Sequence, residues 1–288
     1  MGSTRNLHRT AGSAGKSVPT ALPTLLSVCR PLVMGILNVT PDSFSDGGQF
    51  LDPTEAIARA AEMARQGADI LDIGAESTRP YGGAIPVSAD DEKARLAPVL
   101  SEVVKLGLPV SIDTIKASIA AWAIEQGADI VNDVWGLQRD SSMAPLVAKL
   151  GVPVVVMHNR EVADAAVDIV ADVMAFFSRS LEIAARAGIA RDCIVLDPGI
   201  GFGKTPEQSI TCLARLAEFK RFGLPLLVGA SRKRFISTIT PSPPEGRIGG
   251  SISAHLLAVK KGAAIVRAHD VAETVQALRV SAAIEAAR

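Results

Sequence analysis

Cysteine and histidine are scarce in this sequence. Its 288 residues include 3 cysteines and 4 histidines. The cysteines are odd in number and lack C-x-x-C spacing. This pattern argues against a disulfide framework or a structural zinc site and favours a reducing, cytoplasmic compartment. Because the sequence has no H-E-x-x-H motif, we do not expect a catalytic zinc.

An excess of charge of either sign is also missing. Lys and Arg together number 30, and so do Asp and Glu, so no overall field attracts nucleic acid or a membrane surface. No apolar run in the sequence is long enough to span a bilayer. We therefore predict small-molecule partners, with no nucleic acid and no membrane, and local charge would have to hold any anionic ligand.

Aromatic residues make up only 4% of the chain, whereas hydrophobic residues make up 48%. A core of small and branched residues is typical of parallel strands covered by helices. Short β-rich runs alternate with longer runs of helical period after Pro31. The short runs predict strands near residues 32–38, 69–74, 109–113, 129–133, 153–158, 193–197, 225–230 and 264–269. The longer runs predict helices near residues 53–67, 90–106, 115–126, 143–150, 165–188, 207–222, 247–261 and 271–286.

Gly-Ala pairs occupy three junctions between a predicted helix and the next strand, at 67–68, 127–128 and 262–263. A glycine just past a helix takes the left-handed cap conformation, so these turns are short. Eight such units in a chain of this length predict an α/β fold, a single-domain (β/α)8 TIM barrel over residues 31–288. An open, doubly wound sheet is the alternative.

The first 30 residues differ from the rest, because they hold basic residues and many Ser, Thr, Gly and Ala but no acid. A transit peptide has this composition. The segment is short and poorly amphipathic, however, so we predict a disordered N-terminal tail over residues 1–30.

Every predicted strand ends at or shortly before a polar residue. These residues are Asn38, Glu76, Asp113, Asn132 with Asp133, His158, Asp197, Ser231 with Lys233, and Arg267 with His269. Since the carboxyl ends of barrel strands meet on one rim, this layout predicts an active site there. The loops 40–53 and 77–89 after the first two strands are long and are candidate lids.

Three of these polar ends could accept a forked pair of N–H donors. Asp113 and Asp197 offer carboxylates, and Asn132 can both donate and accept. A 2-amino-4-oxo pyrimidine edge presents such a fork, as a guanidinium does. The plainer interpretation is that Asp113 caps the next helix. The role of His158 is open between a structural histidine and a ligand contact.

Cationic donors follow the last two strands, where phosphate-binding barrels often hold their anion. Lys233 and Arg267 supply charge, and Ser231 and His269 supply further donors. Arg79 lies on a loop and could grip a phosphate, although a lone loop arginine is usually solvated. We expect the acidic and amide groups on one side of the barrel mouth and the cations opposite.

Two further loops carry features of a ligand site. The amide oxygen of Asn38 could join the coordination shell of Mg²⁺ beside a phosphate. The run from Asp197 to Thr205 is glycine-rich but matches neither a P-loop nor a dinucleotide fingerprint. It carries Phe202, a platform for an aromatic ligand.

Four of these segments together resemble the dihydropteroate synthases, a family of pterin-binding TIM barrels. They read GILNVTPDSFSDGG at 35–48, DIGAESTRP at 72–80, DPGIGFGK at 197–204 and GASRKRF at 229–235. The resemblance covers residues 32–285 in the family's order. It implies a transferase of folate biosynthesis (EC 2.5.1.15) that joins 6-hydroxymethyl-7,8-dihydropterin diphosphate to 4-aminobenzoate and releases diphosphate.

The resemblance also implies the role of each site residue. The pterin ring would be bound by Asp113, Asn132, Asp197 and Lys233. The diphosphate would be bound by Asn38, Arg79, Arg267 and His269, with Asn38 also holding Mg²⁺. The 4-aminobenzoate would be bound by Thr78, Arg79, Pro80, Phe202 and Ser231. The catalytic groups would be Asp113, Lys233, Arg267 and His269, in a homodimer.

The chain departs from the family pattern in its second loop, with Ala75 and Tyr81 where the family usually has glycine. The segment after His158 is also shorter than in many members. Three other functions are alternatives: a non-catalytic pterin-binding paralogue, a methyltransferase that uses methyltetrahydrofolate, and a sugar-phosphate aldolase. The aldolase would need a buried Schiff-base lysine, for which Lys233 is a weak candidate.

Overall fold

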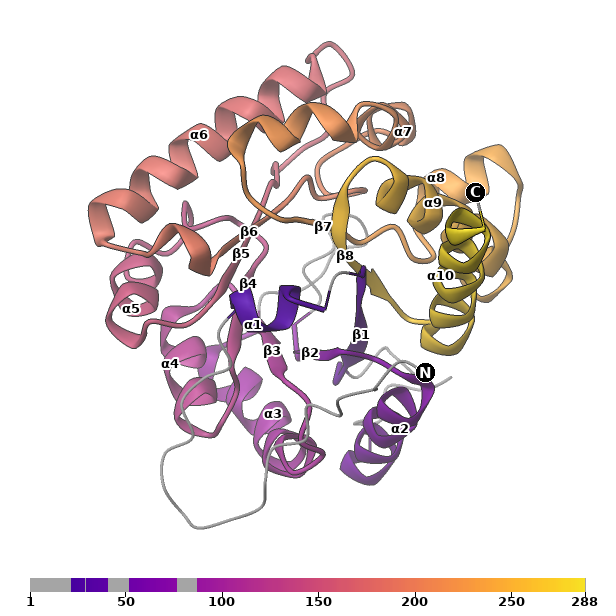
Figure 1. The fold of residues 1–288 in the computed structure, drawn as a ribbon. Coiled ribbons are helices and arrows are strands. Elements are labelled where there is room, and N and C mark those ends of the chain that lie inside the picture. The colour runs from indigo at the N-terminus through magenta and orange to yellow at the C-terminus, as the bar shows by residue number, and fades with distance from the viewer. Residues whose placement is uncertain (1–21, 29, 41–51, 77–86, 288) are drawn as a thin grey trace.

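The computed structural model describes residues 22–28, 30–40, 52–76 and 87–287. Eight parallel strands pair in chain order and close into a barrel, β1-β2-β3-β4-β5-β6-β7-β8, with helices around the outside (Figure 1). The strands are β1 Leu32–Asn38, β2 Ile70–Gly74, β3 Val110–Asp113, β4 Ile130–Asp133, β5 Val154–Met157, β6 Ile194–Asp197, β7 Leu226–Val228 and β8 Ala263–Ala268. The predicted (β/α)8 barrel is therefore confirmed.

The outer layer differs from the prediction in several short elements. Its α-helices are α2 Pro53–Gln66, α3 Ala89–Val104, α4 Ala117–Glu125, α5 Met143–Leu150, α6 Ile169–Ala187, α7 Pro206–Ala214, α8 Arg234–Ile239, α9 Ile248–Lys260 and α10 Val271–Ala286. The predicted helix 207–222 is instead α7 followed by the 3-10 helix Leu216–Phe222. Two other 3-10 helices, Arg191–Cys193 and Pro244–Arg247, and α8 were not predicted, because each is too short for its periodicity to show in the sequence.

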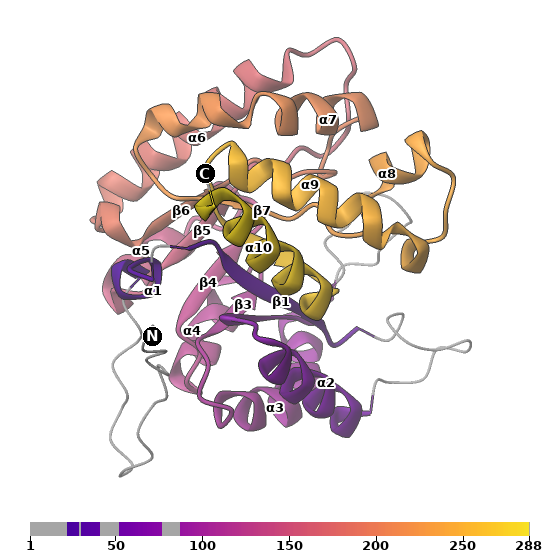
Figure 2. The same ribbon diagram turned by 45° about the vertical axis from the view of Figure 1, so that its right-hand side comes forward.

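A short helix, α1 Leu22–Leu26, corrects the expectation of a disordered tail reaching residue 30. Its Leu25 is buried against interior residues of the barrel such as Leu32 and Met34. These residues belong to the first halves of the strands, so α1 covers the end of the barrel where the strands begin (Figure 2). Residues 1–21 lie outside the described part of the chain.

Side chains alternate between two cores along each strand. Met34 and Ile70 belong to a cluster inside the barrel, whereas Val33, Leu37 and Leu71 belong to the larger core between the strands and the helices. Alternation of this kind follows from the two-residue period of a strand. It decides which polar residues at the strand ends point into the barrel mouth.

Candidate active site

The polar residues at the mouth continue the inward-facing rows of the barrel interior. Asn38 and Asp72 lie an even number of residues after the interior residues Met34 and Ile70. On the other strands the inward rows end on Asp113, Asn132, Asp197 and Arg267. Asp113 pairs in register with Asn132 on one side and Gly74 on the other. The sequence prediction that one rim collects these groups is therefore correct for these residues.

Arg267 is bound directly between two carboxylates. Its Nε donates to Asp72 Oδ2 at 2.6 Å, and its Nη2 donates to Asp113 Oδ2 at 2.9 Å. Asn132 Nδ2 donates to the same oxygen of Asp72 at 3.1 Å. The expected separation of acids from cations is thus wrong for Arg267, which lies among the acids. Burial accounts for this, because charges removed from water need a partner at contact distance.

Asp72 is the residue of this cluster that the sequence analysis left without a role. It is fully buried, and its place two residues after Ile70 puts it on the inward row of β2. The signal was available, because a charged residue in phase with the barrel interior is costly to bury without a partner. The second oxygens of Asp72 and Asp113 have no hydrogen-bond partner in the described chain.

Burial changes the ionisation of both inward carboxyls that the sequence analysis selected. Desolvation raises the pKa of Asp113 to about 7; Arg267 opposes this rise, while Asp72 adds to it. Desolvation likewise raises the pKa of Asp197 to about 6, although Gly199 N–H donates to its Oδ1 at 2.7 Å. The pKa of Arg267 is raised: burial lowers it, but Asp72 and Asp113 outweigh that effect. A ligand that donates N–H groups would complete these acceptors.

Four further predicted site residues, which follow strands six to eight, form two contacting pairs. The Nζ of Lys233 lies 4.0 Å from the centroid of the Phe202 ring, a cation–π contact. Ser231 Oγ lies 3.0 Å from His269 Nδ1 and accepts from the His269 backbone N–H at 3.1 Å. Ser231 and Phe202 are buried. The barrel fold therefore brings these four residues together in two pairs.

Glu76 takes part in an ion cluster next to the site. Lys116 donates to Glu76 at 2.5 Å and to Glu92 at 2.7 Å. Glu92 is fully buried on α3, and its charge contributes to the raised pKa of Asp113. Sequence analysis missed Lys116 and Glu92, because they contact the site only through tertiary packing of α3 against the β3–α4 loop.

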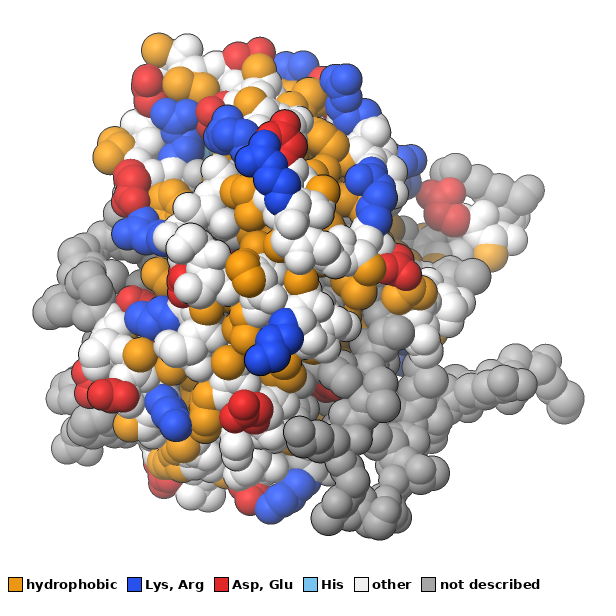
Figure 3. Space-filling model, turned by 90° about the vertical axis from the view of Figure 1, so that its left-hand side faces the viewer, with side chains coloured by type: hydrophobic (Ala, Val, Ile, Leu, Met, Phe, Trp, Pro, Cys, Tyr) orange, Lys and Arg blue, Asp and Glu red, His pale blue; other side chains and the backbone are white. Residues whose placement is uncertain are grey.

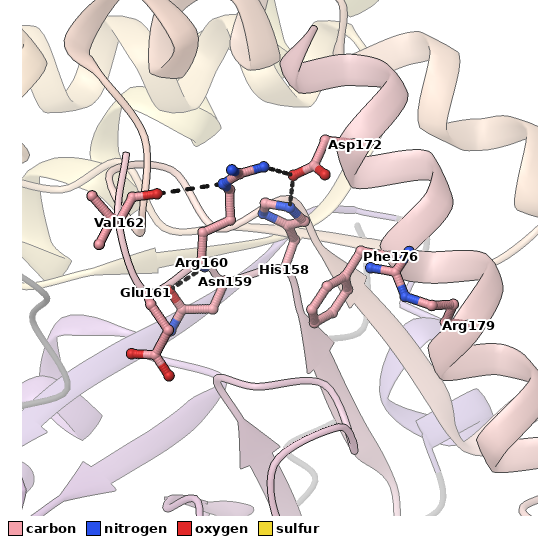
Figure 4. A pocket seen from close by; sticks show the side chains of 8 residues that line it. All are labelled: His158, Asn159, Arg160, Glu161, Val162, Asp172, Phe176 and Arg179. Carbon is pink, nitrogen blue, oxygen red and sulfur yellow. Dashed lines mark hydrogen bonds and ion pairs between the residues drawn. The ribbon is translucent and has the colours of Figure 1, made fainter. Parts of the chain in front are cut away.

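His158 proves to be bound by protein groups. It is fully buried, and its ring joins Asp172 of α6 to Lys204 of the β6–α7 loop. One edge of this cluster borders a cavity of about 370 Å³, lined by residues that include Arg160, Asp172 and Phe176 (Figure 4).

Three predicted site residues, Thr78, Arg79 and Pro80, lie outside the described residues, as do Tyr81 and most of the first loop. In the described ranges, no group of three or more His, Cys, Asp or Glu residues could hold a metal. Asn38 is half-buried at the end of β1. No helix within the same ranges is long and apolar enough to cross a membrane.

Comparison with known proteins identifies close relatives. Residues 34–269 match the model of the pterin binding enzyme family. The chain is 46% identical over 243 residues to a dihydropteroate synthase of Bacillus subtilis, covering 84% of each chain. It is 41% identical over 264 residues to the dihydropteroate synthase of Escherichia coli K12, covering 89% of this chain and 93% of the relative.

Solved structures of similar proteins share the fold. A dihydropteroate synthase from Clostridium difficile, determined with pteroic acid, has 46% identity and a TM-score of 0.84, covering 88% of this chain and 97% of that one. One from Xanthomonas albilineans, determined with 4-aminobenzoic acid, has 45% identity and a TM-score of 0.85, covering 89% and 94%. The X. albilineans protein with 7,8-dihydropteroate has a TM-score of 0.82 at 43% identity, with the same coverage.

Proposed function

This chain belongs to the family of pterin-binding enzymes, and we propose dihydropteroate synthesis as the function that its barrel mouth supports best. The enzyme is a transferase that condenses 6-hydroxymethyl-7,8-dihydropterin diphosphate with 4-aminobenzoate, giving 7,8-dihydropteroate and diphosphate. One observation carries the proposal most directly. A half-buried arginine joins two buried acids at the mouth of a barrel whose relatives make this product, and each acid has one oxygen without a partner among the described residues.

The site residues divide into three groups in this proposal. Asp113, Asn132, Asp197 and Lys233 bind the pterin ring, whose forked N–H donors suit buried carboxylates. Arg267, His269, Asn38 and Arg79 bind the diphosphate. Thr78, Arg79, Pro80, Phe202 and Ser231 bind 4-aminobenzoate. Two contacts support this division. Arg267, assigned to the diphosphate, contacts Asp113, assigned to the pterin. Lys233, assigned to the pterin, contacts Phe202, assigned to 4-aminobenzoate.

Charge development explains how such a site promotes the reaction. When the C–O bond to the diphosphate breaks, negative charge grows on the leaving group, and Arg267 and His269 stabilise it from fixed positions. Positive charge left on the exocyclic carbon spreads into the electron-rich dihydropterin, and the Asp113 carboxylate favours it. The amine of 4-aminobenzoate then attacks that carbon and loses a proton. The scheme needs no side-chain nucleophile.

A magnesium ion fits the residues at the end of β1. Mg²⁺ keeps several water ligands and usually takes one or two protein oxygens together with substrate phosphates. Asn38 supplies one such oxygen, and the described residues contain no cluster of carboxylates that would hold an ion without substrate. When bound, the ion would offset negative charge on the diphosphate. Homodimerisation and a cytoplasmic location are further proposals, based on the family resemblance and the cysteine pattern.

The rival functions make different demands on the chain. A non-catalytic paralogue would be expected to lose residues of the reaction site, yet Asn38, Arg267, His269 and Lys233 are all present. A methyltransferase using methyltetrahydrofolate would bind folates without Mg²⁺ and would not need two loops directed at a diphosphate.

The two-substrate assay tests the proposal. The purified chain should release diphosphate from the dihydropterin diphosphate only when 4-aminobenzoate and Mg²⁺ are both supplied, and 7,8-dihydropteroate should form in equal amount. Methyl transfer from methyltetrahydrofolate, or pterin binding without any turnover, would instead support one of the rivals.

A further inference from the structure

The β6–α7 loop contains a buried lysine, Lys204, that is not among the proposed substrate contacts. Lys204 is only 3% exposed. Its Nζ donates to the backbone oxygen of Phe202 at 3.1 Å and lies 2.6 Å from Nδ1 of His158. A buried lysine is rare unless it is paired, and here the Lys204 ammonium is paired with the His158 ring and the Phe202 carbonyl.

The direction of this hydrogen-bond chain is fixed by its chemistry. An ammonium group can only donate, so Nδ1 of His158 must accept from Lys204. The ring proton therefore lies on Nε2, which donates to Asp172 Oδ2 at 3.0 Å. Asp172 also accepts from Arg160 at 2.9 Å. Figure 4 shows the arginine and histidine meeting the same carboxylate on α6.

Ionisation agrees with this assignment. Burial, reinforced by Lys204, lowers the pKa of His158 to about 4, so the ring is neutral at pH 7. The pKa of Asp172 is lowered by its bond to His158, so it is charged. Burial lowers the pKa of Lys204 to about 8, although Cys212, Asp197 and Asp172 oppose the fall and Arg160 adds to it.

The chain of contacts leads from α6 to a substrate-facing ring. Lys204 holds the carbonyl of Phe202, and the ring of Phe202 lies against Nζ of Lys233. The same loop is fitted closely to the end of β5. The His158 backbone N–H donates to the Asp197 carbonyl at 2.8 Å, and a side chain at Gly199 would collide with the His158 backbone oxygen.

We propose that Lys204 and His158 are positioning residues that hold the β6–α7 loop so that Phe202 faces Lys233 and forms one wall of the 4-aminobenzoate site. The proposal rests on the proposed function for the identity of that substrate. The hydrogen bonds of Lys204 lead to His158 and to the backbone of Phe202. Because Phe202 is assigned to 4-aminobenzoate, we expect loss of these bonds to act mainly on binding of the amine.

The first test concerns the hydrogen bonds alone and needs no substrate. The chain has 4 histidines, so ¹⁵N NMR of histidine-labelled protein can resolve His158. At pH 7 we expect a neutral ring protonated on Nε2, with the Nδ1 signal shifted by the bond from Lys204. The Lys204→Met variant should lose that shift. A ring protonated on Nδ1, or an Nδ1 signal unchanged in the variant, would overturn the proposal even if the enzyme assay succeeds.

The second test is a kinetic split. Lys204→Met should raise KM for 4-aminobenzoate about tenfold or more, because a buried charged hydrogen bond is lost. KM for the dihydropterin diphosphate should change by less than KM for 4-aminobenzoate, because the only pterin group affected is Asp197, whose pKa rises when the Lys204 charge is lost. His158→Asn, whose side-chain oxygen can replace Nδ1 as acceptor, should retain more 4-aminobenzoate affinity than His158→Leu.

A matched control comes from a second buried histidine. His255 on α9 is 1% exposed, and neither ring nitrogen has a hydrogen-bond partner among the described residues, so His255→Leu should leave both KM values unchanged. The positioning role is wrong if Lys204→Met leaves KM for 4-aminobenzoate unchanged. It is also wrong if KM rises equally for both substrates. A wild-type enzyme without two-substrate activity would instead overturn the proposed function and leave the NMR result standing.

Discussion

The buried ions around Arg267 decide the chemistry of the barrel mouth at the scale of single residues. Asp72 and Asp113 both contact one guanidinium, and each keeps an unpartnered oxygen. Two acids sharing one cation cannot both be fully compensated, so the pKa of Asp113 is raised to about 7, chiefly by burial and in part by Asp72. The charge of Asp72 therefore contributes to the ionisation of Asp113.

A pH profile of Asp72→Asn tests this control. In the wild type, kcat/KM for the dihydropterin diphosphate should fall as the pH drops below about 7, because Asp113 becomes protonated. Asp72→Asn removes a negative charge that raises the pKa of Asp113, so the acidic limb should move to lower pH. The same substitution at the exposed Asp90 should leave the profile unchanged. An acidic limb that stays in place or moves upward in Asp72→Asn would contradict the assignment.

The buried His255 makes a separate prediction about stability. Burial lowers its pKa from 6.5 to about 4, so the unfolded chain binds more protons in this range. Its contribution to stability is present above pH 6.5 and is lost as the pH falls toward 4. As the pH falls from 7 to 5, the free energy of unfolding of His255→Leu should therefore rise relative to that of the wild type by about 1 to 2 kcal/mol, as measured by urea unfolding. An unchanged difference between the two proteins at the two pH values would show that His255 is not buried in neutral form.

Single residues show what the sequence could and could not predict. Asp113, Asn132, Asp197 and Arg267 were correctly placed on one rim, because parallel strands bring their carboxyl ends together, but Arg267 was expected opposite the acids rather than between them. Their partners were not foreseen, because pairing depends on which residues point inward and on side-chain reach. Asp72 and Lys204 were both in quoted motifs; the inward phase of Asp72 could have been read from the strand pattern, whereas the burial of Lys204 emerges only from packing.

At the scale of elements, the β6–α7 loop is shaped by glycines that the strand pattern does not reveal. Gly199 has a φ of 64°, and a side chain there would collide with the His158 backbone oxygen. Gly151, the C-cap of α5, has nearly the same φ of 63° but open space around it. Both positions require a left-handed backbone, but only at Gly199 does another part of the chain lie too close for a side chain.

Substitution of this pair by alanine separates the two effects. Gly151→Ala should cost about 1 to 2 kcal/mol of stability through the left-handed backbone alone and leave kinetics unchanged. Gly199→Ala should cost more and reduce kcat/KM at least about tenfold, because the loop must move away from β5 and carry Asp197 and Phe202 with it. Urea unfolding and steady-state kinetics measure both. If Gly199→Ala loses no more stability than Gly151→Ala and has normal kinetics, the β6–α7 loop does not contribute to the site.

Elements were predicted with uneven success. Predicted strand ends lie within two residues of the observed ends, because a turn or helix end precedes the strands and polar residues lie at or shortly after their carboxyl ends. The helix α1 was missed because five residues carry no periodic signal and the tail composition suggested disorder. Its burial depends on the open end of the barrel interior, which exists only after all eight strands have closed.

At the scale of the whole molecule, the charges are balanced and their effects are local. Positive and negative side chains are interspersed on the face seen in Figure 3, in keeping with 30 basic and 30 acidic residues. An anionic substrate is therefore not drawn in by a broad field. Its capture depends on the few cations at the barrel mouth, of which Arg267 is buried among acids.

Arg267→Ala, assayed with both substrates, tests the central claim most directly, with Kd for the dihydropterin diphosphate measured in parallel. If Arg267 stabilises charge on the departing diphosphate, the rate of 7,8-dihydropteroate formation should fall about a hundredfold or more, and Kd should rise by far less. The opposite pattern, weakened pterin binding with turnover preserved at saturation, would contradict the account.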